Sequence, residues 1–402
     1  MTKNNRITAG TAQLSVTIPT DVDDIENYIL QLITQENDAF NSNIKNIKIN
    51  IKNKDTITVN ASKAESSTNA HTLEQALQLV KNFGIINIET QVTEEDIVIN
   101  KNITIRGNSI ANTNIVNNAS EVLIQSIEFV NSPIINNKQL LVDECSFKNT
   151  TTSCITNNDE LTLYKSLFEN NKADYGACIN ITNKNISTII DECTFRNNTA
   201  SQYGGCIFSQ KGNDIEITKC EFSKNKATYN GSSISIYGNA DISDNTFYNN
   251  NGNNEIYLMK GYIDMDRNVF DGKINAILIM DGQIDADLNY WGYNDESHIQ
   301  ALEENNNIII NNYLISHCEV EKHEDKKYAV GIINQYRNRL EIETTTISFI
   351  ESTLPVMIGN VVSSLNKREI VVQNNSKMKI GQAQVDVIVW ESRFNLMIQV
   401  KR

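Results

Sequence analysis

Hydrophobic residues in the middle of the chain recur in short alternating runs, each placed at a fixed distance before an aromatic residue. The aromatic returns about every 23 residues, a period that indicates a repeat architecture. The series is Phe129, Phe147, Phe168, Phe195, Phe222, Phe247, Phe270 and Trp291. The positions five and seven before the aromatic are apolar in most repeats. Residues two apart share one face of a strand, so each repeat supplies a strand with the same buried face.

The position two before the aromatic begins with Ile127 and then carries small or polar residues. It holds Cys145, Cys193 and Cys220, and then Asn245, Asn268 and Asn289 in three consecutive repeats. If equivalent positions stack, asparagine amides can hydrogen-bond from one coil to the next, which satisfies polar groups that are costly to bury. Small thiols fit the same position. We therefore predict a buried asparagine ladder and buried thiols that bind no metal.

A second short strand follows an asparagine-rich bend in several repeats, for example at residues 178–181, 233–236 and 256–258. The strands are too close together for helices to lie between them. The pattern therefore predicts an all-β parallel β-helix and not a doubly wound sheet.

The repeated segments FENNKADYGACI, FRNNTASQYGGCIF and FSKNKATYNGSSI resemble the FxxN and GGAI-type repeats of polymorphic outer-membrane proteins and of adhesin-like surface proteins of methanogenic archaea. LNYWGYND, residues 288–295, is similar to the ending that closes β-helices in the archaeal group. The resemblance covers residues 72–295, more than half of the chain. It implies a right-handed parallel β-helix of the pectate-lyase kind, and it specifies the fold better than the ligand.

Three regions are expected. Residues 1–65 form a small α+β module for attachment or oligomerisation, with a helix over 20–40 that places Ile25, Tyr28, Ile29, Leu32 and Ile33 on one face. Residues 66–300 form the β-helix, whose open end is covered by a short helix with a Thr72-x-x-Gln75 capping box. Residues 311–402 alternate as an antiparallel, sandwich-like β domain.

Composition excludes some partners. The formal net charge is −14, and an acidic surface repels phosphate backbones, so no nucleic acid is expected. No apolar run reaches the roughly 18 residues of a membrane span, and the first thirty residues do not read as a signal peptide. The seven cysteines form no CxxC pair, so neither a disulfide framework nor a zinc knuckle is indicated.

Four acidic residues form an outward-facing patch: Asp264, Asp266, Asp285 and Asp287. On neighbouring strands these carboxylates should repel one another. A Ca²⁺ ion would relieve that repulsion with the oxygen ligands it prefers. The alternative is a solvated acidic face that binds no metal.

The same carboxylates have the residue types of a glycosidase acid and nucleophile. However, the Asn-Thr-Asp and Gly-His-Gly motifs of polygalacturonase-like enzymes are absent from the coils, and the Asp-Asp pair, Asp23 and Asp24, precedes them. We therefore assign no catalytic residue, and a polysaccharide lyase or glycoside hydrolase remains the alternative function.

Tyr175, Tyr203 and Tyr229 each stand just before the glycine-containing bend of their repeat. Stacked on one face, their rings would bind sugar rings through apolar surfaces. The other interpretation is a structural role in the bend.

The favoured function is a non-enzymatic adhesin-like protein that binds a cell-surface glycan or surface protein. It is expected outside the cell, as a cell-surface adhesin or as a viral tail fibre or receptor-binding protein. A homo-oligomer is expected for avidity, a trimer in the case of a viral fibre. No cofactor is expected other than the candidate Ca²⁺.

Overall fold

The computed structural model describes residues 24–33, 44–270, 275–292 and 296–306, positions 308, 310 and 313–322, and strands between 327 and 400. Burial of individual side chains is described from Asn53 onward and for few residues beyond 310. Within these described stretches, no helix is both long and apolar enough to cross a membrane.

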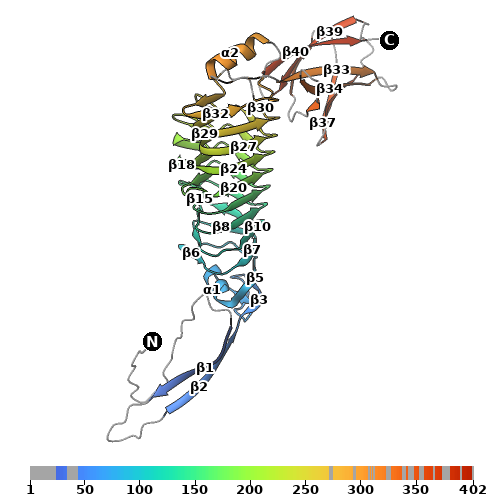
Figure 1. Ribbon diagram of the computed structural model, residues 1–402. Coiled ribbons are helices and arrows are strands. Elements are labelled where there is room, and N and C mark those ends of the chain that lie inside the picture. The colour runs from blue at the N-terminus through green and yellow to red at the C-terminus, as the bar shows by residue number, and fades with distance from the viewer. Residues whose placement is uncertain are drawn as a thin grey trace.

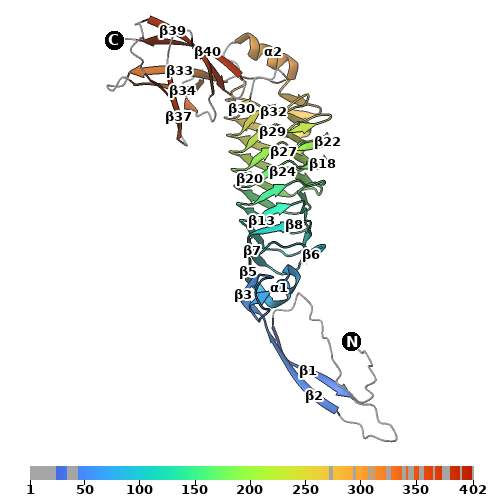
Figure 2. The ribbon, with the colours of Figure 1, turned by 180° about the vertical axis from the view of Figure 1, so that it is seen from behind.

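The body of the molecule is a right-handed parallel β-helix of about ten turns, which stands as a column in Figures 1 and 2. Three columns of parallel strands run along it. The first column contains β5 (Val80–Ile88), β7 (Ile103–Gly107), β10 (Val122–Gln125), β13 (Leu140–Asp143), β16 (Leu161–Tyr164), β20 (Ser187–Asp191), β24 (Asn213–Thr218) and β32 (Gly282–Asp285). The phenylalanine column contains β8 (Ser109–Ala111), β11 (Glu128–Val130), β14 (Ser146–Lys148), β17 (Leu167–Glu169), β21 (Thr194–Arg196), β25 (Glu221–Ser223), β28 (Thr246–Tyr248) and β30 (Val269–Phe270).

The third column contains β6 (Asp96–Ile99), β9 (Asn114–Asn117), β12 (Ile134–Asn136), β15 (Ile155–Asn157), β19 (Ile179–Ile181), β23 (Ile207–Ser209) and β31 (Ile277–Ile279). The long strands β27 (Ile234–Ser243) and β29 (Ile256–Asp266) run through both the third and the first column. These two columns therefore belong to one 19-stranded sheet.

The coils lie in register, as the repeat predicts. Phe129 pairs with Phe147, and the same pairing continues from strand to strand as far as Phe270. Successive ring centroids are 4.6 to 5.0 Å apart, and Trp291 ends the stack 4.7 Å from Phe270. All these rings are buried. The aromatic period therefore encodes a continuous internal stack of the kind that offset aromatic packing favours.

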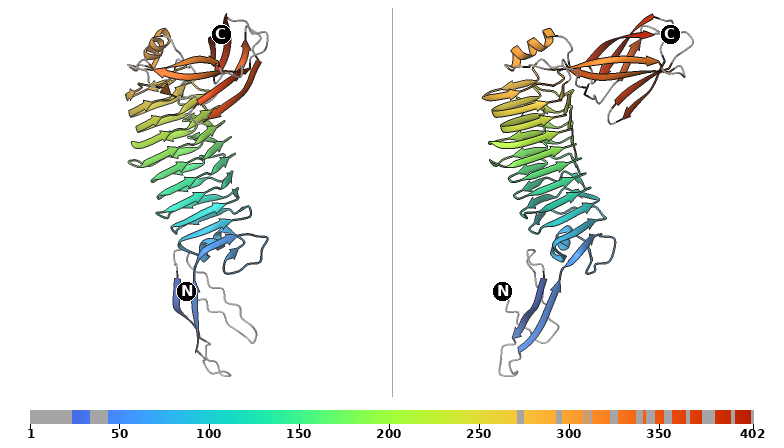
Figure 3. Two further views of the ribbon diagram at one scale, coloured as in Figure 1. Left: turned by 90° about the vertical axis from the view of Figure 1, so that its right-hand side faces the viewer. Right: turned by 45° about the vertical axis from the view of Figure 1, so that its right-hand side comes forward.

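Three coils carry an additional small sheet. It consists of β18 (Lys172–Tyr175), β22 (Thr199–Tyr203) and β26 (Lys226–Ala227), paired in that order. The three strands pair in parallel, like the strands of the other columns, which point the same way in the stack of coils in Figure 3. β18 is the first strand of the small sheet, so the column has a step at this coil.

The N-terminal end of the β-helix is covered as predicted. α1 (Leu73–Leu79) begins at Thr72, whose side chain and that of Gln75 form the predicted capping box. Leu73, Ala76 and Leu77 are buried against the first coils. β3 (Lys54–Val59) already pairs in parallel with β4 (Asn69–Ala70) and β5, so the β-helix begins before residue 66.

The helix predicted over residues 20–40 is wrong. Asp24–Ile33 forms strand β1, which pairs antiparallel with β2 (Ile44–Lys52), and Figure 1 shows this hairpin extending below the column. The run NYILQLI fits helical spacing, but it is also rich in β-branched and aromatic residues. The antiparallel pairing with β2, whose sequence alternates, favours the strand over the helix for this run.

A helix that the sequence did not predict covers the other end. α2 (Glu296–Asn306) buries Ile299 and Leu302 over the last coil. The Asn306 side chain accepts a hydrogen bond from the Ile277 backbone N–H at 2.7 Å. Both open ends of the sheet are therefore covered, which prevents edge-to-edge pairing.

Beyond α2 the strands are antiparallel, as expected for this region. One sheet contains β33 (Leu314–Lys322), β34 (Lys327–Tyr336), β35 (Glu341–Ile342), β37 (Met357–Ser364) and β38 (Lys367–Gln373). The other contains β36 (Ser348–Ser352), β39 (Gly381–Val389) and β40 (Ser392–Val400).

Candidate functional site

The predicted asparagine ladder is present inside the column. The Asn245 side-chain amide donates to Asn268 Oδ1 at 3.0 Å, and the Asn268 amide donates to Asn289 Oδ1 at 2.9 Å. All three side chains are buried. Asn268 Oδ1 also accepts a hydrogen bond from the Asn245 backbone N–H, and Asn289 Oδ1 accepts one from the Asn268 backbone N–H. The ladder therefore supplies hydrogen-bond partners to the backbone at the bend where the chain leaves the first column.

Two further buried ladders were not identified from the sequence. One joins Asn171, Asn198, Asn225 and Asn250 through amide hydrogen bonds of 3.0 to 3.1 Å. The other joins Asn117, Asn136 and Asn157. The first ladder occupies the third position after the repeated phenylalanine, so the asparagine of the FxxN pattern was the signal.

The six cysteines whose burial the structure describes, all within the β-helix, are buried, as predicted. Cys145, Cys193 and Cys220 are at most 2% exposed. Burial raises the pKa of the Cys145 thiol to about 12, and burial followed by the neighbouring Cys193 raises the pKa of Cys220 well above its ordinary value. The Cys145 and Cys220 thiols are therefore protonated packing groups at neutral pH.

The three tyrosines come together on the outside of the column. The Tyr175 and Tyr203 rings lie 6.4 Å apart, and the Tyr203 and Tyr229 rings 5.4 Å apart. Tyr229 is 51% exposed, and the other two are half-buried. Gly176 follows Tyr175 with a φ of +47°, where a Cβ would meet the Ile179 carbonyl oxygen at 2.2 Å. The bend thus requires glycine, and it turns the chain so that the tyrosine lies outside.

Two aromatics that the sequence reasoning missed complete this group. Phe208 lies 4.8 Å from the Tyr175 ring, and Tyr257 lies 5.8 Å from the Tyr203 ring. Both belong to the third column, one on each side of the small Ser235 in the strand register, and both are buried, at 7% and 8% exposure. We call Tyr175, Tyr203, Phe208, Tyr229 and Tyr257 the aromatic cluster.

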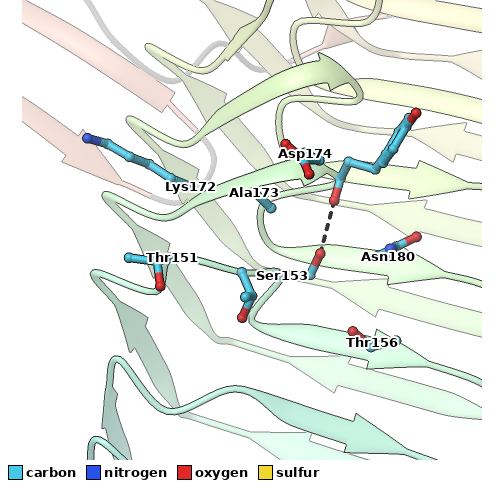
Figure 4. A pocket seen from close by; sticks show the side chains of 9 residues that line it. Thr151, Ser153, Thr156, Lys172, Ala173, Asp174 and Asn180 are labelled. Atoms are coloured by element: carbon cyan, nitrogen blue, oxygen red, sulfur yellow. Dashed lines mark hydrogen bonds between the residues drawn. The ribbon is translucent and has the colours of Figure 1, made fainter.

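An open groove of about 520 Å³ lies beside the aromatic cluster, beneath the edge of β18. Figure 4 shows how its walls come from neighbouring coils. Its lining includes Thr151, Thr152, Thr156, Asp174, Tyr175 and Asn180. Tyr175 therefore belongs both to the aromatic cluster and to the lining of the groove, and it connects the two. Neutral hydroxyl and amide groups beside an aromatic ring can bind a polar ligand that also has apolar faces.

The acidic patch extends over one more coil than the four predicted aspartates. Asp264 pairs in register with Asp285, and also with Asp241 of the preceding coil. Partial burial, then the charges of Asp285 and Asp241, raise the pKa of Asp264. Asp287 lies past the end of β32, and its backbone N–H donates to Asp285 Oδ1 at 3.3 Å.

Asp266 is held by a neighbouring cation. Arg267 donates to Asp266 Oδ2, and it also binds Asp244 at 2.9 and 3.0 Å. Across the described side chains, no three His, Cys, Asp or Glu residues are grouped so as to hold a metal ion. Calcium binding by the four predicted aspartates stays a prediction.

No protein-family model, curated protein or solved structure matches this chain.

Proposed function

We propose that the protein is a non-enzymatic attachment protein of the adhesin type, which binds a cell-surface glycan through the aromatic cluster. The observation that carries the proposal is that exposed and half-buried tyrosines gather on one side of the column and that one of them, Tyr175, lines a polar groove. Aromatic faces and hydroxyl-rich pockets suit the apolar faces and hydroxyl groups of sugars. The resemblance of the repeats to adhesin-like surface proteins of methanogenic archaea supports the same function.

The protein acts outside the cell in this proposal, as a cell-surface adhesin or on a virus particle as a tail fibre or receptor-binding protein. The β-helix serves as a spacer, and the hairpin β1–β2 or the C-terminal sheets attach it to its support. Weak contacts gain strength when several copies bind together, so we further propose a homo-oligomer.

The test is binding of the full chain to a glycan array and to whole cells. A triple variant with Tyr175→Ala, Tyr203→Ala and Tyr229→Ala is expected to lose about tenfold or more in affinity, because exposed aromatic anchors dominate such contacts. Tyr262→Ala is the matched control, since Tyr262 is 41% exposed but lies outside the cluster. Equal binding by the triple variant and the wild type would contradict the proposal.

A polysaccharide lyase or glycoside hydrolase is the second candidate. The observation in its favour is the raised pKa of Asp264 and Asp266, caused first by partial burial, which is the direction a general acid requires. Against it, the groove is lined by other residues, and Arg267 binds Asp266. New reducing ends or unsaturated products from wall polysaccharide, lost in Asp264→Asn, would establish the enzyme in place of the adhesin.

A further inference from the structure

The groove beneath β18 exists because the coils change length. β18 is the first strand of the small sheet, so the coil before it, which contains Thr151 and Thr152, supplies no strand for it to pair with. β18 therefore overhangs residues 151–156, while Thr156 of β15 and Asn180 of β19 contribute from the third column. A step of this kind, bordered by side chains from four segments, forms a concave site on the side of the column.

The backbone edge of β18 is already used by the chain itself. The Lys172 N–H donates to the Thr150 carbonyl oxygen at 2.9 Å, and the Ser153 hydroxyl donates to the Tyr175 carbonyl oxygen at 2.9 Å, the bond drawn in Figure 4. A peptide that added to this sheet as a further strand would need these groups. These two bonds oppose the addition of a peptide strand and favour a ligand that contacts the side chains lining the groove.

Two of those side chains are fixed in place. The Tyr175 hydroxyl donates to Gln202 Oε1 at 2.7 Å, and Phe208 supports the ring. The Ser201 hydroxyl donates to Asp174 Oδ1 at 2.6 Å, and within the described residues Asp174 Oδ2 has no hydrogen-bond partner. A fixed ring beside a carboxylate with a free oxygen is preorganised for a flat ligand that carries hydroxyl donors.

Charge narrows the class of ligand. Asp174 is the acid in the groove lining, and Lys172, the cation, points away from Thr156 and Asn180 in Figure 4. The whole chain carries a formal charge of −14, which repels polyanions. An uncharged ligand is repelled neither by the Asp174 carboxylate nor by the net negative charge of the chain.

We propose that this groove is a subsite for one neutral hexopyranose unit of the glycan, with Asp174 accepting hydrogen bonds from sugar hydroxyls and Tyr175 packing against an apolar sugar face. This inference rests on the proposed glycan-binding function and adds a position and a sugar class to it. The hydroxyl groups of Thr151, Thr152 and Thr156 and the amide of Asn180 supply the remaining donors and acceptors.

The experiment titrates the full chain calorimetrically with defined tetrasaccharides. The neutral probes are tetrasaccharides of glucose, mannose, galactose and N-acetylglucosamine, and the acidic probes are those of galacturonate and mannuronate. We expect a neutral probe to bind and Asp174→Asn to weaken it by about tenfold or more, because hydrogen bonds to a charged acceptor are the stronger ones. Asparagine keeps an oxygen for Ser201, so the fold should be unchanged, and a thermal melt checks this.

Asp214→Asn is the matched control. Asp214 is also exposed and also accepts one hydrogen bond from the neighbouring coil, from Asn239 at 3.1 Å, but it lies outside the groove lining. We expect this variant to bind the neutral probe as the wild type does. An equal loss in both variants would overturn the subsite in favour of a general charge effect.

The other outcomes separate the two proposals. If neutral glycans bind and the triple tyrosine variant loses them while Asp174→Asn does not, the proposed function stands and the subsite is overturned. If acidic probes bind more tightly, and Asp174→Asn improves their binding, the sugar class is overturned. If neither the array nor any probe shows binding, the proposed function and the subsite are both overturned.

Discussion

The inside and the outside of the column both carry stacked aromatic rings, but they differ in extent. The internal stack passes through every coil from Phe129 to Trp291 without a gap. The aromatic cluster outside occupies only a few coils, at the place where the small sheet and the groove occur. Continuity along the whole column is explained by packing, whereas a local aromatic surface on the outside points to a partner.

The largest expected effect comes from breaking the internal stack. Phe195 is fully buried between Phe168 at 5.0 Å and Phe222 at 4.8 Å. Phe195→Ala should therefore lower the free energy of unfolding by about 3–5 kcal/mol, the range for removing a buried phenylalanine. Urea-unfolding midpoints followed by circular dichroism measure this.

Tyr229→Ala is the comparison from the outside surface. Because Tyr229 is 51% exposed, its removal should change the free energy of unfolding by no more than about 0.5 kcal/mol. If the two variants shifted the urea midpoint equally, the distinction between an internal packing stack and an external contact surface would be lost.

A smaller effect is expected from two adjacent asparagines that belong to different ladders. Asn136 is buried and bonds Asn117 and Asn157 at 2.9 and 2.8 Å. Asn137 bonds Asn118 and Asn158 at the same two distances, but on the solvent side. Asn136→Ala should cost about 2–3 kcal/mol of unfolding free energy, because it leaves buried amides without partners.

Asn137→Ala should cost well under about 1 kcal/mol, since water replaces the lost hydrogen bonds. The two variants remove the same atoms from neighbouring positions, so a difference in urea midpoint reports burial together with the two backbone hydrogen bonds that Asn136 adds, to the Glu160 carbonyl oxygen and from the Lys138 N–H. Equal midpoints would show that the ladder contributes no more than a surface hydrogen bond.

The sequence predicted the column and its contents because both depend on position within a repeat. Phe195 and Asn268 fall in columns that recur along the chain, and coils in register turn such columns into stacks. The hairpin strand β1 could not be distinguished from a helix in the same way, because it has no repeat to compare with. For α2, the spacing of Ile299 and Leu302 was the available signal.

The groove was harder to predict, because it depends on contacts between residues of different coils. Phe208 reaches Tyr175 only because the third column and the small sheet lie side by side. A signal was nevertheless present in the repeat length. Phe168 and Phe195 are 27 residues apart, whereas Phe129 and Phe147 are 18 apart. The lengthened repeats are the ones that contain β18 and β22.

The smallest expected effect concerns the acidic row on the outside, where Asp264 lies between Asp241 and Asp285. Partial burial and then these two charges raise the pKa of Asp264 above its ordinary value of 3.8, so the folded state binds this proton more tightly than the unfolded state. Ionisation of Asp264 therefore lowers stability as the pH rises through and above that value. Asp264→Asn should stabilise the protein at about pH 7 by about 0.2–1 kcal/mol, because like charges on facing strands repel.

The gain should disappear at about pH 2.5, well below the ordinary pKa of 3.8, where the carboxyl is protonated in both states. Urea midpoints of the wild type and the variant at the two pH values measure it, and a lower midpoint for the variant at neutral pH would contradict it.

Millimolar calcium distinguishes the two interpretations of the acidic patch. If the patch binds the ion, calcium should raise the wild-type midpoint more than that of Asp264→Asn, because binding to the folded state adds stability. An equal response in both proteins would identify the row as a solvated acidic surface that binds no metal. The aromatic cluster would then remain the candidate binding surface on the outside of the column.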